Sequence, residues 1–255
     1  MLRSLALTGA LLVAGTAHAA GGHAMPYKFE ADLGNEPSLQ RGARNFMNYC
    51  SGCHSMQHLR YARLAADLGI PEDLLEQNLM FTSSKTGDHI VSAMPKTSSA
   101  WFGATPPDLT VETRMRGPAW VYNYLLTFYV DPGRPLGTNN LMLPGASMPN
   151  VLGALQGVQV KNEAPAGEHG EAAGAEHAAE GGHGKHAAPF KLVAKGSMDE
   201  KEFQKFVADT VNFMAYAAEP GALTRVGTGV KAILFLLLFT WLAYLLKREY
   251  WKDVH

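Results

Sequence analysis

The residues best suited to chemistry form one short run, Cys50-Ser51-Gly52-Cys53-His54. Cys50 and Cys53 are the only 2 cysteines in the chain. A C-x-x-C-H run is typical of the covalent attachment of a c-type haem. Each thiol can form a thioether bond to one vinyl group of the porphyrin, and the adjacent histidine can bind the iron as an axial ligand. The run therefore predicts one haem c, held by Cys50 and Cys53 with His54 on its iron.

Two other kinds of site also use a C-x-x-C pair. A thioredoxin-type disulfide normally lies at a strand-to-helix junction of a βαβ unit, and the sequence shows no such pattern. A structural zinc site needs two further ligands, and the chain has no second C-x-x-C. Covalent haem attachment takes place outside the cytoplasm in exported chains, so an export signal would favour the haem.

The N-terminus carries such a signal in residues 1–19. Arg3 supplies the positive start, Leu5 to Val13 form a short apolar core, and Ala17-His18-Ala19 is an A-x-A cleavage site. The apolar core is too short to span a bilayer. We expect a cleaved signal peptide, with an uncleaved anchor as the alternative, and a mature chain that begins near Ala20 outside a bacterial inner membrane.

A second apolar segment, residues 225–246, is long enough to cross a membrane, since about 20 residues at ~1.5 Å each fill the hydrocarbon core. Lys231 lies near its start and can reach the interface. The basic tail, residues 247–255, is expected to be cytoplasmic by the positive-inside rule. Residues 20–224 would then form one haem domain in the periplasm. A buried core helix is the alternative, but the segment is apolar all round.

The net charge of −1 argues against a nucleic-acid partner. Within the domain, apolar residues recur at helical spacing in several stretches. The first predicted helix, residues 38–49, leads into Cys50. Residues 59–80 hold a further helical pattern, with a helix start at Pro71 and with Leu74, Leu75 and Leu79 on one face. A buried helix is predicted over 118–130. Residues 81–110 and 131–150 are expected to be loops. No convincing strand pattern appears, so the predicted fold is mostly α.

A last helix is predicted after the capping-box signature of residues 197–200. It should end near Glu219, and its apolar stripe should pack on the helix that ends at Cys50. The stripe consists of Phe203, Phe206, Val207, Val211 and Met214. Residues 161–189 differ sharply, being rich in Ala, Gly, Glu and His without a period. They are expected to form a flexible insert, with metal binding by their histidines as the alternative.

The second axial ligand decides what such a haem can do. Methionine raises the potential and closes the iron to substrates, whereas an open position permits gas or peroxide chemistry. Met148 and Met94 are the main candidates, since each precedes a proline in loop-like sequence. Met148 is favoured because Pro144 and Pro149 stiffen its loop, but the pattern alone leaves both open. His58 is too close to the motif to reach the opposite face, and His89 is a further possibility.

The order of several motifs resembles the cytochrome c1 family, the haem subunits of the cytochrome bc1 complex (ubiquinol–cytochrome c reductase). The resemblance covers nearly the whole mature chain. Its motifs are Arg41-Gly42 before the C-x-x-C-H run, Pro106-Pro107-Asp108-Leu109, Arg114-Met115-Arg116, Leu125-Leu126-Thr127, Pro144-Gly145-Ala146-Ser147-Met148-Pro149, and Ala217-Ala218-Glu219-Pro220 before the C-terminal apolar segment.

The resemblance implies a role for each site residue. Met148 matches the axial methionine of the family, in preference to Met94. Arg116 matches an arginine that contacts a haem propionate, and Pro107 and Leu109 match residues that wall the haem edge. The resemblance further implies a membrane complex with cytochrome b and a Rieske iron–sulfur protein. The haem would take an electron from the Rieske protein and pass it to a cytochrome c, so the isolated chain would make and break no substrate bonds.

Two departures from the family accompany the resemblance. The chain lacks cysteines for the additional disulfide of some members, and the 161–189 insert is outside the family's pattern. Acidic residues Glu72, Asp73 and Glu76 could steer a basic cytochrome c, although an ordinary solvated helix face explains them as well. The alternatives to an electron-exit subunit are the haem c subunit of a terminal oxidase and a haem sensor or peroxidase with an open sixth position.

Overall fold

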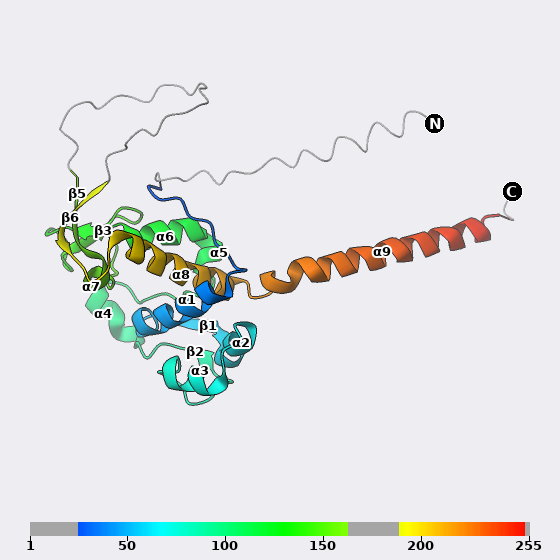
Figure 1. Cartoon of the computed structure of the whole chain (residues 1–255), viewed down its shortest axis with the longest axis horizontal. Coiled ribbons are helices and arrows are strands. Elements are labelled where there is room, and N and C mark those ends of the chain that lie inside the picture. The colour runs from blue at the N-terminus through cyan, green and yellow to red at the C-terminus, as the bar shows by residue number, and fades with distance from the viewer. Residues whose placement is uncertain (1–24, 163–188, 253–255) are drawn as a thin grey trace, which may run out of the picture.

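The computed structural model describes residues 25–162 and 189–252 (Figure 1). The predicted signal peptide and most of the predicted insert lie outside these residues. The helices are α1 (Glu36–Tyr49), α2 (Tyr61–Asp67), α3 (Glu72–Asn78), η1 (Lys96–Ser98, 3-10), α4 (Ser99–Phe102), α5 (Glu112–Arg116), α6 (Pro118–Leu126), α7 (Gly153–Gln156), α8 (Glu200–Ala218) and α9 (Ala222–Tyr250).

The strands are β1 (Met56–Arg60), β2 (His89–Ile90), β3 (Phe128–Val130), β4 (Thr138–Asn140), β5 (Gly157–Lys161) and β6 (Phe190–Lys195). They pair only as three antiparallel two-stranded ladders, β1–β2, β3–β4 and β5–β6. The prediction of a mostly α domain with long loops is therefore confirmed. The short strand pairs were not expected, because strands of two to six residues carry little periodic signal.

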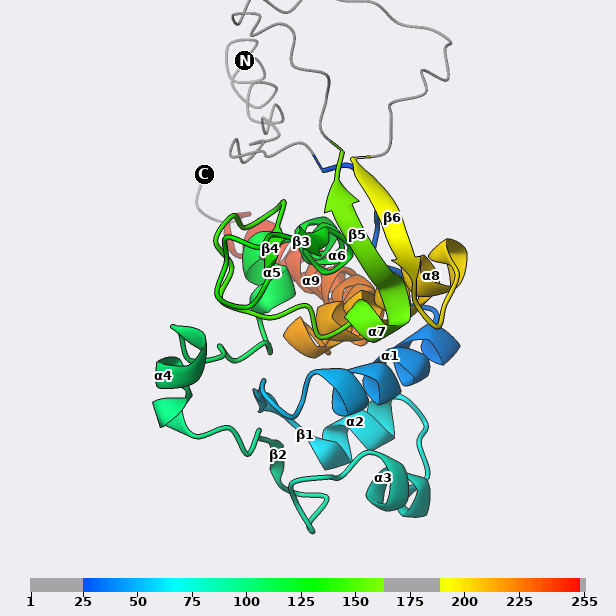
Figure 2. The ribbon, with the colours of Figure 1, turned by 90° about the vertical axis from the view of Figure 1, so that its left-hand side faces the viewer.

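The centre of the domain is the pair α1 and α8, which pack along each other as predicted. Figure 2 shows α2 and α3 on one side of α1, and α5 and α6 on the other. The predicted stripe of α8 is buried at Phe203, Val207, Val211 and Met214. Phe206 lies at the margin, where its ring meets Tyr49 edge-on at 5.3 Å.

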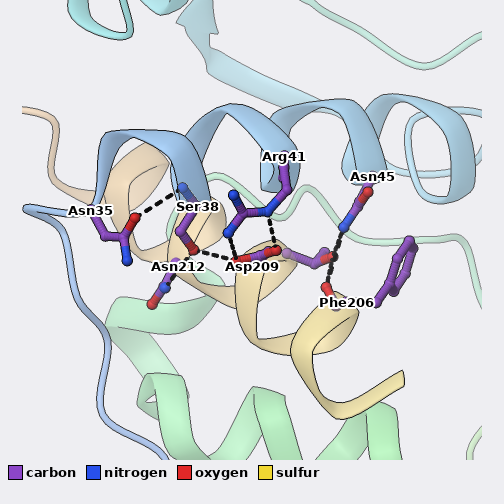
Figure 3. A network of polar contacts seen from close by, with 8 residues as sticks. Asn35, Ser38, Arg41, Asn45, Phe206, Asp209 and Asn212 are labelled. Atoms are coloured by element: carbon purple, nitrogen blue, oxygen red, sulfur yellow. Dashed lines mark hydrogen bonds and ion pairs between the residues drawn. The ribbon is translucent and has the colours of Figure 1, made fainter. Parts of the chain in front are cut away.

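The two central helices also share a polar network (Figure 3). Asp209 on α8 is 6% exposed and accepts hydrogen bonds from Ser38 Oγ at 2.5 Å and from Arg41 Nε at 2.6 Å. Asn212 donates to Ser38 Oγ at 2.9 Å, and its amide oxygen accepts from the Asp32 backbone N–H at 3.0 Å. Each buried polar group is thus partnered across the interface, which holds α1 in one register on α8.

The start of α8 differs from the prediction by two residues. Asp199, not Ser197, is the N-cap: it accepts from Glu202 N, and the Glu202 carboxylate accepts from Asp199 N. Ser197 N and Met198 N instead donate to the carbonyls of Ala154 and Leu155. These bonds to α7 keep both residues outside the helix, so the capping box forms two residues later.

Two predicted helices are shorter in the structure. The 59–80 stretch contains the end of β1, then α2 and α3, with a break at Gly69, whose φ of +57° is unfavourable for other residues. Pro71 starts α3 as predicted, and Leu75 and Leu79 are buried, but Leu74 is exposed. The predicted helix over 118–130 ends at Leu126, because Phe128–Val130 pair with β4.

Among the described residues, α9 is the one helix long and apolar enough to cross a membrane. Its 29 residues extend over about 43 Å. None of its apolar stretch is buried within the molecule, unlike the core helix of a soluble protein. Figure 1 shows α9 projecting alone from the domain. The helix contains the predicted segment 225–246 and fits a membrane-anchored chain.

Candidate haem site

The C-x-x-C-H run forms a tight turn at the end of α1. Cys50 is the C-cap of that helix, and its carbonyl accepts from the backbone N–H groups of Cys53 at 3.0 Å and His54 at 2.8 Å. Ser51 Oγ donates back to the carbonyl of Met47 at 2.7 Å. The turn therefore continues the helix by local bonds and holds the two cysteines and the histidine together.

Cys50 and Cys53 form no disulfide with each other. Burial raises the pKa of the Cys50 thiol to about 12, and the neighbouring Cys53 adds to the shift. Thiol–disulfide exchange requires a thiolate, which a raised pKa disfavours. The environment of Cys50 thus argues against the thioredoxin-type alternative.

His54 is held by the backbone of a distant loop. Its Nδ1 lies 2.8 Å from the carbonyl oxygen of Pro107, which can only accept, so we assign the ring proton to Nδ1. Burial lowers the pKa of His54, while the Pro107 carbonyl, Glu112 and Asp108 act in the opposite direction. A neutral imidazole oriented in this way leaves Nε2 as the atom that can bind a metal.

The Pro107 loop is itself tied to the segment that follows His54. Leu109 N donates to the Ser55 carbonyl at 2.8 Å, and Gln57 N donates to the Asp108 carboxylate at 2.7 Å. Asp108 also accepts from Thr110 Oγ1 at 2.5 Å. The loop that contacts the imidazole is thus positioned by the chain next to the imidazole.

A cavity of about 390 Å³ opens beside this turn. Every residue that the sequence analysis assigned to the site lines it: Cys50, Cys53, His54, Pro107, Leu109, Arg116 and Met148. Other apolar walls come from α1, α4, α6 and α8, at Tyr49, Phe102, Val121, Leu125 and Met214.

Met148 reaches this cavity on the loop between β4 and α7, and Pro144 and Pro149 of the same loop also line it. The described residues that line the cavity do not include Met94, Met142, His58 or His89. Met214 of α8 does line it, and sequence reasoning treated that residue only as core. The position of Met214 in the apolar stripe of α8 did not indicate that it also lines the cavity, because the same face of the helix forms both core and cavity wall.

Arg116 lies between two partners on the cavity wall. Its Nε donates to Glu112 Oε1 at 2.6 Å, and its guanidinium lies 4.4 Å from the centre of the Trp120 ring. Trp120 stacks in turn on Tyr124 at 5.3 Å. The row of residues 112, 116, 120 and 124 follows helical spacing, but sequence reasoning singled out Arg116 alone.

The donor set of this cavity fits a haem c. One turn supplies two thiols and an oriented imidazole, two methionines supply thioether sulfurs, and the walls are largely apolar. The Nε of Arg116 is occupied by Glu112, so its terminal nitrogens remain for a carboxylate. The acidic residues Glu72, Asp73 and Glu76 are exposed on α3, which contributes nothing to the cavity lining.

Comparison with known proteins places the chain in a family. Residues 28–254 match the model of the Cytochrome C1 family. The chain is 48% identical to cytochrome c1 of Allochromatium vinosum, over 100% of both chains. It is 39% identical to a protein named ammonia monooxygenase gamma subunit from Nitrosomonas europaea, over 98% of this chain and 97% of that one. It is 28% identical to cytochrome c1 of Rhodospirillum rubrum, over 99% and 97%. The chain therefore belongs to the cytochrome c1 family, the electron-transfer haem subunits of the cytochrome bc1 complex.

Proposed function

We propose that this chain carries one haem c, attached through thioether bonds to Cys50 and Cys53, with His54 and Met148 as axial ligands. In this proposal it accepts an electron from a Rieske iron–sulfur protein and passes it to a cytochrome c. The observation that carries the proposal is that the C-x-x-C-H turn and the Met148 loop line the same cavity.

The protein's own groups have distinct tasks in this proposal. The Pro107 carbonyl holds the His54 ring in the neutral tautomer, so that Nε2 is available. The Met148 loop supplies a thioether and covers one wall, while apolar side chains limit the access of water. A haem bound there supplies a one-electron exchange between two oxidation states of its iron. Thioether ligation favours electron transfer over substrate binding, which argues against a haem sensor or peroxidase.

Arg116 is proposed to bind a haem propionate through its terminal nitrogens. Glu112 and the Trp120 ring fix the guanidinium at the cavity wall. A bidentate guanidinium–carboxylate pair in such a partly dehydrated place is stronger than a neutral hydrogen bond. Leu109 contributes an apolar contact from the Pro107 loop.

We further propose that residues 1–19 are removed as a signal peptide, that residues 20–224 lie in the periplasm, and that the tail 247–255 is cytoplasmic. The support is the apolar, unburied α9 and the basic residues Lys247 and Arg248 in its last turn. Residues 161–189 are proposed to be an insert that leaves the domain in place. Lys161, their first residue, and Phe190, which directly follows them, are paired in the β5–β6 ladder.

Spectroscopy of the oxidised protein tests the axial ligation. Methionine–iron ligation gives a weak charge-transfer band in the far red, and Met148→Ala should abolish it and lower the reduction potential. Met94→Ala is the matched control, since that side chain does not line the cavity. If the band survives Met148→Ala, the assignment is wrong, and Met214→Leu becomes the decisive variant.

Copurification tests the proposed partners. Antibody against this chain should recover a cytochrome b and a Rieske protein from solubilised membranes. Recovery of a terminal oxidase core would support the oxidase alternative instead. One relative is named as a subunit of ammonia monooxygenase, and recovery of the other subunits of such an enzyme would likewise overturn the assignment to a bc1 complex.

A further inference from the structure

The loop that carries Met148 starts directly after Asn140, the last residue of β4. This asparagine is 0% exposed, an unusual place for an amide side chain. From Leu143 to Pro149 every residue of the following loop lines the haem cavity. The side chain therefore lies at the base of the segment that must hold the thioether.

The hydrogen bonds of the Asn140 side chain go to the start of the Met148 loop and to α6. Its Oδ1 accepts from the backbone N–H groups of Met142 at 2.9 Å and Leu143 at 3.2 Å. Its Nδ2 donates to the carbonyl of Tyr124 on α6 at 2.7 Å. One side chain thus joins the start of the loop to the helix that forms the neighbouring wall.

A second tie holds the middle of the loop. Asn139 Oδ1 accepts from Gly145 N at 2.8 Å, and Arg134 Nη2 donates to the Gly145 carbonyl at 2.8 Å. Ala146 N closes a turn on the Leu143 carbonyl at 3.1 Å. These contacts constrain the chain to within two residues of Met148, and the Asn140 bonds set where that constrained segment begins.

We propose that Asn140 is a positioning residue for Met148: it fixes the loop so that the thioether stays at the cavity. The proposal rests on the proposed role of Met148 as axial ligand. Without the Asn140 amide, the buried Met142 N–H and the Leu143 N–H lose their acceptor, and the Tyr124 carbonyl keeps only the longer bond from Thr127 N at 3.4 Å. Unpaired buried groups are costly, so the loop would open to hydrate them, and the sulfur would move with it.

Asn123 offers a matched control for a purely structural effect. It is also 0% exposed, and it lies on α6. Its Nδ2 donates to the carbonyls of Tyr27 and Ala119, both at 2.8 Å, and its Oδ1 accepts from Tyr27 N at 2.9 Å. Burial and bonding therefore match those of Asn140, but its long-range tie holds the N-terminal segment instead of the Met148 loop.

The experiment compares the full-length holoprotein in detergent with Asn140→Ala, Asn140→Asp, Asn123→Ala and Met148→Ala. The far-red band of the oxidised protein and the affinity for added imidazole are measured at equal haem content. We expect Asn140→Ala to lose most of the band and to bind imidazole about 10- to 100-fold more tightly, the scale of one to two lost buried hydrogen bonds. Asn123→Ala should lower the unfolding temperature and leave both spectroscopic readouts unchanged.

Asn140→Asp keeps an acceptor for the N–H groups of Met142 and Leu143, so it should retain more of the band than Asn140→Ala. It replaces Asn140→Ala as the test variant if the alanine variant does not fold. The inference is wrong if the Asn140 variants keep the band and imidazole affinity of the parent while Met148→Ala loses the band. It is also wrong if Asn123→Ala loses the band to the same degree. A band that survives Met148→Ala would refute the ligation proposal instead.

Discussion

Gly42 allows α1 and α8 to approach closely, and its replacement by alanine should be costly. A Cβ atom at this position would lie 2.0 Å from the Asp209 carbonyl oxygen and 2.6 Å from Phe213 Cβ. Contacts below 3.0 Å are essentially never seen, so the helices must separate by about 1 Å, the difference between 3.0 and 2.0 Å. The obstacle is backbone, which cannot rotate away as a flexible side chain would.

The expected net loss for Gly42→Ala is about 2 kcal/mol of unfolding free energy. Overpacking costs ~1–3 kcal/mol and should be near its upper limit here, while alanine in a helix interior recovers ~1 kcal/mol. Thermal unfolding of the full-length holoprotein, followed by circular dichroism, should show a midpoint lower by about 4–8 °C. Gly87→Ala is the control, since nothing lies within 4 Å of its added Cβ. Equal midpoints for the two variants would refute the close approach of α1 and α8.

Three further outcomes are expected. Asp209→Ala should lower the unfolding free energy in urea by about 2 kcal/mol, less than a fully buried pair would lose, because Arg41 is 39% exposed and can be hydrated; an unchanged midpoint would contradict this. Glu112→Gln removes a negative charge from the cavity wall and should raise the reduction potential in a redox titration, whereas a lower potential would refute the argument. Burial, aided by a hydrogen bond to Asp67, raises the pKa of Tyr216 above its ordinary 10.0, so stability should fall as pH rises above about 10, and Tyr216→Phe should reduce that fall.

Long amphipathic helices were the most predictable part of the fold. The stripe on α8 and the helix before Cys50 follow from periodicity, because a helix that buries one face repeats apolar residues at helical spacing along the chain. The ends of elements were less predictable. Phe128–Val130 continue an apolar run that reads as helix, and only pairing with β4 makes them a strand. The cap of α8 moved to Asp199 because two residues before it bond to α7.

In the candidate site, too, some features could be predicted from the sequence and others depend on tertiary contacts. The roles proposed for Arg116, Pro107 and Leu109 came from resemblance, and the structure adds why their positions suit those roles. No local pattern indicates that Pro107 would present its carbonyl to His54, since the two residues are 53 positions apart. Asn140 and Trp120 were missed for the same reason, because their partners are assembled by the loops and helices around the cavity.

Read by itself, the sequence decides the chemistry that depends on neighbours in the chain. Cys50, Cys53 and His54 need only a helical turn to present two thiols and an imidazole together, and the apolar C-terminal segment needs only its length to span a bilayer. The tertiary structure decides what surrounds them. It brings Met148, Met214 and Arg116 to one cavity, selects the ring nitrogen that faces it, and anchors the Met148 loop through Asn140, because these contacts join segments that sequence spacing leaves apart.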